Sequence, residues 1–108
     1  MIERFNIQSL IRNRADQKSF HMAAEKYVRI EFHNMRRGDS LGPFAYQGNV
    51  ILTCYRGAFR IETAADTVEL AEFDQAVLPP GERTRLTSVN DGTLQLIWSP
   101  PYAPATQG

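Results

Sequence analysis

The sequence predicts an all-β protein built as one antiparallel sandwich or barrel. Short runs of β-prone residues recur along most of the chain, and several alternate apolar and polar side chains, as half-buried strands do. Glycine, proline, asparagine and aspartate separate these runs, which is typical of short strands joined by tight turns. A length of 108 residues is the length of one domain, so we expect residues 1–108 to fold as a single unit.

The first 26 residues are expected to form an N-terminal extension. Residues 4–7 predict a strand, and Ser9 is a candidate cap for a short helical turn that follows it. The polar run over residues 12–19 is interpreted as a solvated connection. We expect His21 to lie in a loop, and the sequence assigns it no role.

The first clear strand is expected over residues 27–35. Val28, Ile30 and Phe32 alternate there with polar or charged residues, which is the period of a strand with one buried face. Six further β-prone segments follow, each bounded by a turn signal: residues 49–55, 59–62, 67–70, 74–78, 83–89 and 93–98. Residues 99–108 are rich in proline, which cannot continue a central strand, and are expected to form a tail.

The stretch over residues 38–57 is regularly spaced. Gly38 is followed after five residues by Phe44, and Tyr46 stands two positions later. Three more residues lead to Val50, and six beyond it reach Gly57.

A second stretch, residues 73–88, also has turn-forming residues at regular spacing. Phe73-Asp74 is followed after four residues by Pro79-Pro80-Gly81, and then by Thr84. Together the two stretches resemble the two motifs of the cupin superfamily, in particular small, single-domain RmlC-like cupins. The resemblance covers about residues 28–100 and implies a double-stranded β-helix, the jelly-roll barrel.

Cupins of this family hold a divalent metal with three histidines and a glutamate. In this sequence the corresponding positions are Phe44, Tyr46, Val50 and Thr84. Transition metals in proteins are bound by imidazole, thiolate or carboxylate groups, and none of the four residues supplies one. We therefore expect the metal site to be lost and no cofactor to be bound.

The cupin resemblance also implies which side chains point into the barrel, because residues two apart on a strand share a face. The expected ligand-binding residues of the barrel interior are Phe44, Tyr46, Val50, Leu52, Cys54, Thr84, Leu86 and Ser88. An apolar wall with a few polar groups is typical of sites for small organic ligands. The alternative is that Phe44 and Val50 fill the space that a metal and its ligands would occupy.

Three other residues invite a functional interpretation. His33 and Glu31 share a strand face and could act as an acid–base pair, although a plain surface pair is the more common arrangement. Trp98 is expected to anchor the core or a dimer interface, with ligand stacking as the alternative.

The amino-acid composition argues against some classes of binding partner. Twelve basic residues balance twelve acidic ones, so nothing suggests a nucleic acid or a membrane surface as partner. A single cysteine excludes an internal disulfide, and no segment has the apolar length of a membrane span, so we expect a cytoplasmic protein. Small cupins often pair, so a homodimer is expected from the resemblance.

Three functions remain open. The first is a module that binds a small organic molecule in the barrel without metal. The second is a metal-independent isomerase or epimerase, in which Tyr46, His33 and Glu31 would supply the acid and base. The third is a metal-dependent dioxygenase with ligands recruited from elsewhere, for which two histidines in the chain are few.

Overall fold

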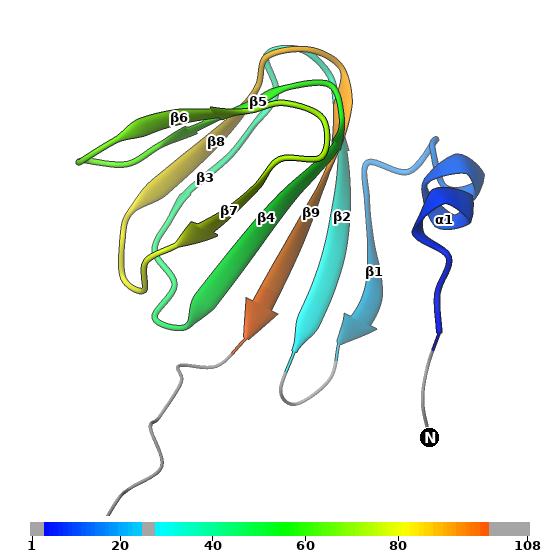
Figure 1. Ribbon diagram of the computed structural model, residues 1–108, viewed down its shortest axis with the longest axis horizontal. Helices are drawn as coiled ribbons and strands as arrows, with labels where there is room; N and C mark the ends of the chain where they lie inside the picture. Colours follow the sequence, from blue (N-terminus) through cyan, green and yellow to red (C-terminus); the bar gives the residue numbers. More distant parts are fainter. Residues whose placement is uncertain (1–3, 25–27, 100–108) are drawn as a thin grey trace, which may run out of the picture.

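Over its described residues, the protein is a sandwich of two antiparallel sheets with one short helix beside it (Figure 1). The computed structural model describes residues 4–24 and 28–99. The five-stranded sheet, called sheet A, has the order β1-β2-β9-β4-β7, and the four-stranded sheet B has the order β3-β8-β5-β6. The predicted all-β fold with a short N-terminal helical element is therefore confirmed.

The elements follow one another closely along the chain. Their bounds are α1 Ile7–Asn13, β1 Ser19–Ala24, β2 Arg29–Met35, β3 Ser40–Phe44, β4 Asn49–Arg56, β5 Phe59–Glu62, β6 Thr67–Leu70, β7 Gln75–Leu78, β8 Thr84–Ser88 and β9 Gly92–Ser99. The single helix of the described residues has seven residues, far too few to cross a membrane.

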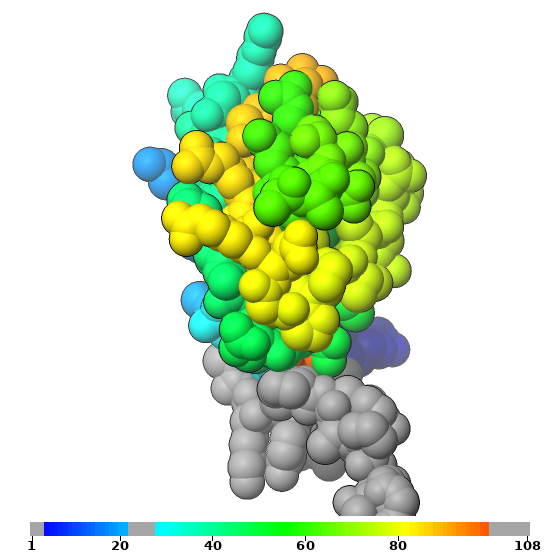
Figure 2. All heavy atoms as spheres, turned by 90° about the vertical axis from the view of Figure 1, so that its left-hand side faces the viewer, coloured from blue at the N-terminus to red at the C-terminus, as the bar shows by residue number. Residues whose placement is uncertain are grey.

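The core lies between the two sheets. Sheet A contributes Leu52, Leu94 and Leu96, and sheet B contributes Phe59 and Leu86, all of which are at most 1% exposed. Residues that are direct register partners, such as Leu52 and Leu96, have side chains on the same face of the sheet. Any residue of sheet A whose register partner is a core residue therefore also lies on the inner face. Figure 2 views the sandwich from the side on which residues of β5 to β8, coloured green to orange-yellow, form most of the surface.

The N-terminal extension is more regular than the sequence suggests. Residues 4–7 do not form a strand: α1 begins at Ile7, and the Asn6 side chain, not that of Ser9, caps it by accepting a hydrogen bond from the Ser9 N–H at 2.8 Å. The predicted connection over residues 12–19 ends in β1, which pairs with β2 at the edge of sheet A.

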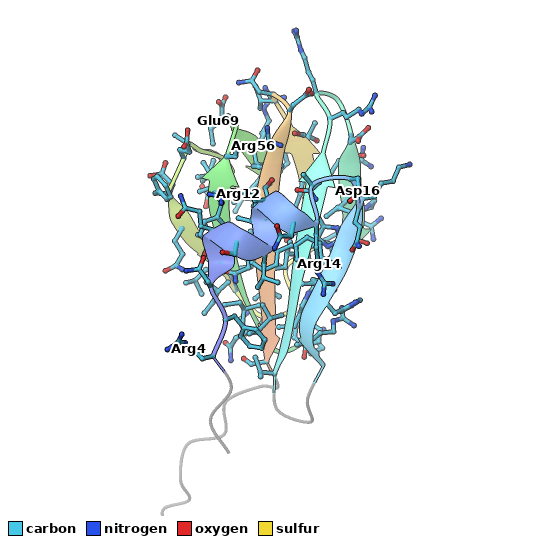
Figure 3. All side chains as sticks on the ribbon, turned by 90° about the vertical axis from the view of Figure 1, so that its right-hand side faces the viewer. Arg4, Arg12, Arg14, Asp16, Arg56 and Glu69 are labelled. Atoms are coloured by element: carbon cyan, nitrogen blue, oxygen red, sulfur yellow. The ribbon has the colours of Figure 1, made fainter. Side chains whose placement is uncertain are left out.

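The helix lies on the outer face of sheet A (Figure 3). The guanidinium of Arg14 lies 5.3 Å from the ring centroid of Phe20 on β1, and Phe20 stacks on Phe32 of β2 at 5.1 Å. The Asn34 side chain donates to the carbonyl groups of Arg14 and Gln17, which fixes the chain between α1 and β1. Sheet A is therefore covered on both faces at this edge.

One further strand, β3, was not expected from the sequence. It contains Gly42 and Pro43, which normally argue against a strand, and its pairing with β8 shifts register between Leu41 and Phe44. Because β3 is the edge of sheet B, one side of its backbone needs no ladder partner and the proline is accommodated. The remaining strands agree with the predicted segments to within about two residues. The proline-rich tail over residues 99–108 lies outside the described residues except for its first residue.

In the turn between β6 and β7, Phe73 has the positive φ that is usual for glycine. Phe73 has a φ of 67° and is 75% exposed, and its N–H bonds to the carbonyl of Cys54. Asp74 closes the turn by accepting a hydrogen bond from the Ala71 N–H at 2.9 Å. A phenylalanine at positive φ is strained because its Cβ crowds the backbone.

Replacing Phe73 by glycine is expected to stabilise the protein by about 1 kcal/mol, because the strain of the left-handed backbone is relieved and little buried apolar area is lost. Urea denaturation measures the change. Phe73→Ala is the matched control, since it removes the ring but keeps the Cβ, and it should give no gain. A loss of stability in Phe73→Gly would show that the ring makes a stabilising contact.

Candidate functional site

The inner face of sheet A changes from apolar to polar at its β1–β2 edge. Glu31 is the register partner of Leu96, and His33 is the partner of Leu94. Leu94 and Leu96 are core residues, so Glu31 and His33 also face the inside of the barrel. The expectation of a plain surface pair was wrong, because Glu31 is only 8% exposed.

Glu31 is surrounded by nitrogen atoms from three strands. Its Oε1 accepts hydrogen bonds from Trp98 Nε1 at 3.0 Å and from His33 Nε2 at 3.1 Å. Its Oε2 lies 3.2 Å from His21 Nε2 and 3.3 Å from Arg29 Nε. We call these five residues the Glu31 cluster.

The cluster keeps Glu31 ionised. Burial disfavours the charged form and by itself would raise the pKa of Glu31, but the hydrogen bonds from His33 and Trp98 and the charges of His33 and Arg29 favour the carboxylate. The pKa of Glu31 is lowered as a result. An ionised carboxylate can only accept, so His33 carries a hydrogen on Nε2 and donates it to Glu31.

Aromatic rings stand directly beside the cluster. The Trp98 ring contacts Phe44 with centroids 5.2 Å apart and meets Tyr46 edge to face at 5.1 Å. The guanidinium of Arg29 lies over the same indole at 5.2 Å. Phe44, Tyr46 and Trp98 form what we call the aromatic wall.

The wall and the cluster share one end of the sandwich. It is the end at which β2, β4 and β8 begin and β3 and β9 end, the lower end in Figure 1, and we call it the Trp98 end. Tyr46 and Trp98 are only partly buried, and the side chain of Arg29 is 49% exposed, so a small molecule in solvent can reach them.

Solved structures of other proteins share this architecture. One is BH2720 from Bacillus halodurans (TM-score 0.80, 13% identity, covering 99% of this chain and 87% of that one). Another is a cupin-2 domain protein from Shewanella frigidimarina (TM-score 0.74, 9% identity, 88% and 93% covered). A third is the cupin superfamily protein DSY2733 from Desulfitobacterium hafniense (TM-score 0.72, 17% identity, 75% and 74% covered). The protein has the cupin fold.

The comparisons by sequence gave no match to this chain. No protein-family model and no curated protein sequence matches it. The cupin likeness therefore rests on structure, and at these identities it shows the fold alone, because one barrel hosts many activities.

The cupin barrel places the eight predicted interior residues in two groups. Six are at most 2% exposed inside the core: Val50, Leu52, Cys54, Thr84, Leu86 and Ser88. Their polar atoms are already engaged, since the hydroxyls of Thr84 and Ser88 donate to the carbonyls of Glu82 and Asn90. Phe44 and Tyr46 are only partly buried and belong to the aromatic wall.

Cys54 is a core residue of the cupin barrel. Its Sγ contacts the carbonyl oxygens of Arg56 and Gly57 at 3.5 Å each, and burial raises the pKa of its thiol. A buried thiol with a raised pKa is a poor nucleophile.

The positions that correspond to cupin metal ligands do not fit a metal ion. Phe44 and Val50 offer only carbon, and the Thr84 hydroxyl is bonded to a backbone carbonyl. Val50 and Phe44 instead lie against Trp98, as its register partner and its ring contact. Within residues 4–24 and 28–99, no group of three or more histidine, cysteine, aspartate or glutamate side chains is arranged to hold a metal.

Sequence reasoning missed two members of the cluster, His21 and Arg29, and the contact of Trp98 with Glu31. His21 is not in a loop: it lies on β1 as the register partner of Glu31. The alternation of Ser19, Phe20 and His21 is the only sequence signal for this strand, and it is too short to stand out. Arg29 and the bond from Trp98 to Glu31 depend on the pairing of β2 with β9, which sequence spacing does not reveal.

The opposite end of the barrel has an open cleft of about 590 Å³. It lies between the chain over residues 15–18 and the turns that carry Arg36, Asp39, Arg56 and Asp91. Asp39 and Asp91 each accept a hydrogen bond from a backbone N–H of the turn over residues 36–39. The cleft has basic and acidic side chains in equal number and no aromatic ring, so we place the candidate site at the Trp98 end.

Proposed function

We propose that the protein binds a small organic molecule at the Trp98 end of the barrel, without a metal ion. The observation that carries this proposal is the Glu31 cluster on the inner face, directly beside the aromatic wall. Apolar rings with a few converging polar groups are the usual composition of sites for small organic ligands.

The polar groups of the site are held in place before any ligand arrives. Glu31 fixes the ring of His33 through Nε2 and the indole of Trp98 through Nε1. Among the described residues, no hydrogen bond uses the Nδ1 of His33 or the hydroxyl of Tyr46. Such preorganised groups can bind a ligand at little entropic cost.

A second candidate is metal-independent proton transfer of the isomerase or epimerase type. It is favoured by the position of His33, whose ring is oriented by Glu31 through Nε2 and whose Nδ1 makes no hydrogen bond to a described residue. Tyr46 would supply the acid. A metal-dependent dioxygenase has less support, because it needs a set of metal ligands that the described residues do not offer.

The decisive experiment uses Trp98, the single tryptophan of the chain, as its reporter. Untagged protein purified without chelator is analysed by native and elemental mass spectrometry, and its fluorescence is titrated with small-molecule libraries. We expect a co-purified or titratable organic ligand that shifts the Trp98 emission, and metal far below one ion per chain. A near-stoichiometric metal that is lost in His33→Ala would contradict the proposal.

Proton transfer has its own readout. A ligand found in this way is incubated with the protein in D₂O and analysed by NMR. Binding alone leaves its carbon-bound hydrogens unchanged, whereas an isomerase or epimerase exchanges one of them for deuterium. Exchange that persists in His33→Ala would exclude His33 as the base.

The homodimer expected from the cupin resemblance stays a prediction. Near-zero net charge does not oppose self-association. Light scattering at micromolar concentration is expected to give the mass of two chains, and a mass near 12.2 kDa would contradict it.

A further inference from the structure

The Glu31 carboxylate is not itself available to a ligand. Each of its two oxygens already has two nitrogen neighbours within 3.3 Å, and its side chain is 10% exposed. Two hydrogen bonds and two ion pairs therefore surround the carboxylate and leave little of it open to a ligand. Its role is to position the residues around it.

Arg29 is the charged residue of the cluster that remains open to solvent. Its Nε is held by Glu31 at 3.3 Å and its guanidinium lies over the Trp98 ring at 5.2 Å, so the plane of the group is fixed by two contacts. Among the described residues, no hydrogen bond uses its two terminal nitrogens. A guanidinium held in this way presents N–H donors in the planar arrangement that matches a carboxylate.

The arrangement of charges favours an anion over a cation. Four nitrogen atoms surround the negative charge of Glu31, two in hydrogen bonds and two in ion pairs, whereas the side chain of Arg29 is 49% exposed. A cationic ligand would meet the guanidinium first and would find little of the Glu31 carboxylate open. An anion would meet terminal N–H groups of Arg29 that make no hydrogen bond to a described residue, at the edge of the aromatic wall.

We propose that the ligand of the Trp98 end is a small organic acid, with its carboxylate on the terminal nitrogens of Arg29 and its apolar body against Tyr46 and Phe44. This inference rests on the proposed function, because it names the chemical class of molecule that the same site takes. It assigns the recognition of charge to one residue, Arg29, and the recognition of the body to the aromatic wall.

Three probes with the same ring separate charge from shape: phenylacetate, 2-phenylethanol and phenethylamine. Each is titrated into the ¹⁵N-labelled full chain to about 20 mM, where a millimolar Kd is still measurable, while the Trp98 indole N–H resonance is followed. We expect phenylacetate to give a saturable shift and to bind about tenfold more tightly than the alcohol, with the amine weakest. The single indole makes the readout specific to this site.

Variants of Arg29 test the assignment to one residue. Arg29→Gln should weaken phenylacetate about tenfold or more and leave 2-phenylethanol unchanged, whereas Arg29→Lys, which keeps the charge but not the planar fork, should lie between. Arg85→Gln removes an exposed arginine of β8 in sheet B and should have no effect. An unchanged spectrum for other residues confirms that each variant is folded.

The outcomes separate the two proposals. If the alcohol or the amine binds as tightly as the acid, or if Arg29→Gln leaves phenylacetate binding unchanged, the assignment of an organic acid is overturned while binding at the Trp98 end stands. If none of the three probes shifts the indole resonance, both proposals are overturned.

Discussion

Gly57→Ala is expected to destabilise the protein by about 3–5 kcal/mol, a large part of the stability of a domain of this size. Gly57 has a φ of +81°, a conformation that L-residues rarely adopt. A Cβ added there would lie 2.5 Å from the carbonyl oxygen of Asp91 and 2.8 Å from the Cα of Gly92. Both contacts are with backbone, which cannot rotate away, so the turns before β5 and β9 would have to separate.

Gly38→Ala is the matched control for this prediction. Gly38 has a similar φ of +89°, but an added Cβ would meet nothing within 4 Å. Only the backbone strain remains, so a loss of about 1–2 kcal/mol is expected. Urea denaturation of both variants gives the comparison through the transition midpoints. Equal losses would show that the close approach of the two backbones at Gly57 adds nothing to its requirement for glycine.

Glu31→Ala is expected to cost about 2–4 kcal/mol, because it leaves the Trp98 and His33 donors without an acceptor and Arg29 without its ion pair. Glu69→Ala is the control. Glu69 is an exposed carboxylate on β6, and its removal should change stability by less than about 0.5 kcal/mol. Thermal or urea unfolding measures both, and similar values for the two variants would contradict the central position of Glu31.

The contribution of Glu31 should also depend on pH. Its pKa is lower in the folded protein than the ordinary value of 4.5, so folding favours the ionised form. The stabilisation is then fully present above about pH 4.5 and is lost as pH falls through the lower pKa of the folded state. The stability difference between wild type and Glu31→Gln, which mimics the protonated acid, should shrink as pH falls below about 4.5. A difference that persists unchanged to pH 3 would contradict this.

Much of the fold could be predicted because its turns are specified locally. Gly38, Gly57 and Gly81 all adopt positive φ in the structure, at the positions where the two motifs place their glycines. The same geometry persists at Phe73, where the sequence has no glycine, so the turn is maintained by its surroundings: the bond from Phe73 N–H to Cys54 and the Asp74 cap. Local patterns find such turns because they depend on single residues.

The site could not be predicted because both faces of β2 are covered. Alternation shows that Phe32 and Glu31 point to opposite sides, but an apolar side chain usually marks the inner face. Here Phe32, which is 0% exposed, is buried on the outer face against Phe20, and the polar Glu31 and His33 face the barrel. Helix α1 and the residues that follow it cover the outer face of sheet A, so an apolar residue of β2 is buried on that face. The spacing of residues 27–35 contains no signal for this extra layer.

The edge position of β1 has a consequence for aggregation. Among the described strands β1 pairs with β2 alone, so, like β7 at the other edge of sheet A, it can detach by local unfolding with the loss of one ladder. Its departure would uncover Phe32 and expose the unpaired backbone of β2, a template for edge-to-edge association with other molecules. Loss of β1 is therefore expected to promote edge-to-edge aggregation of the protein at high concentration.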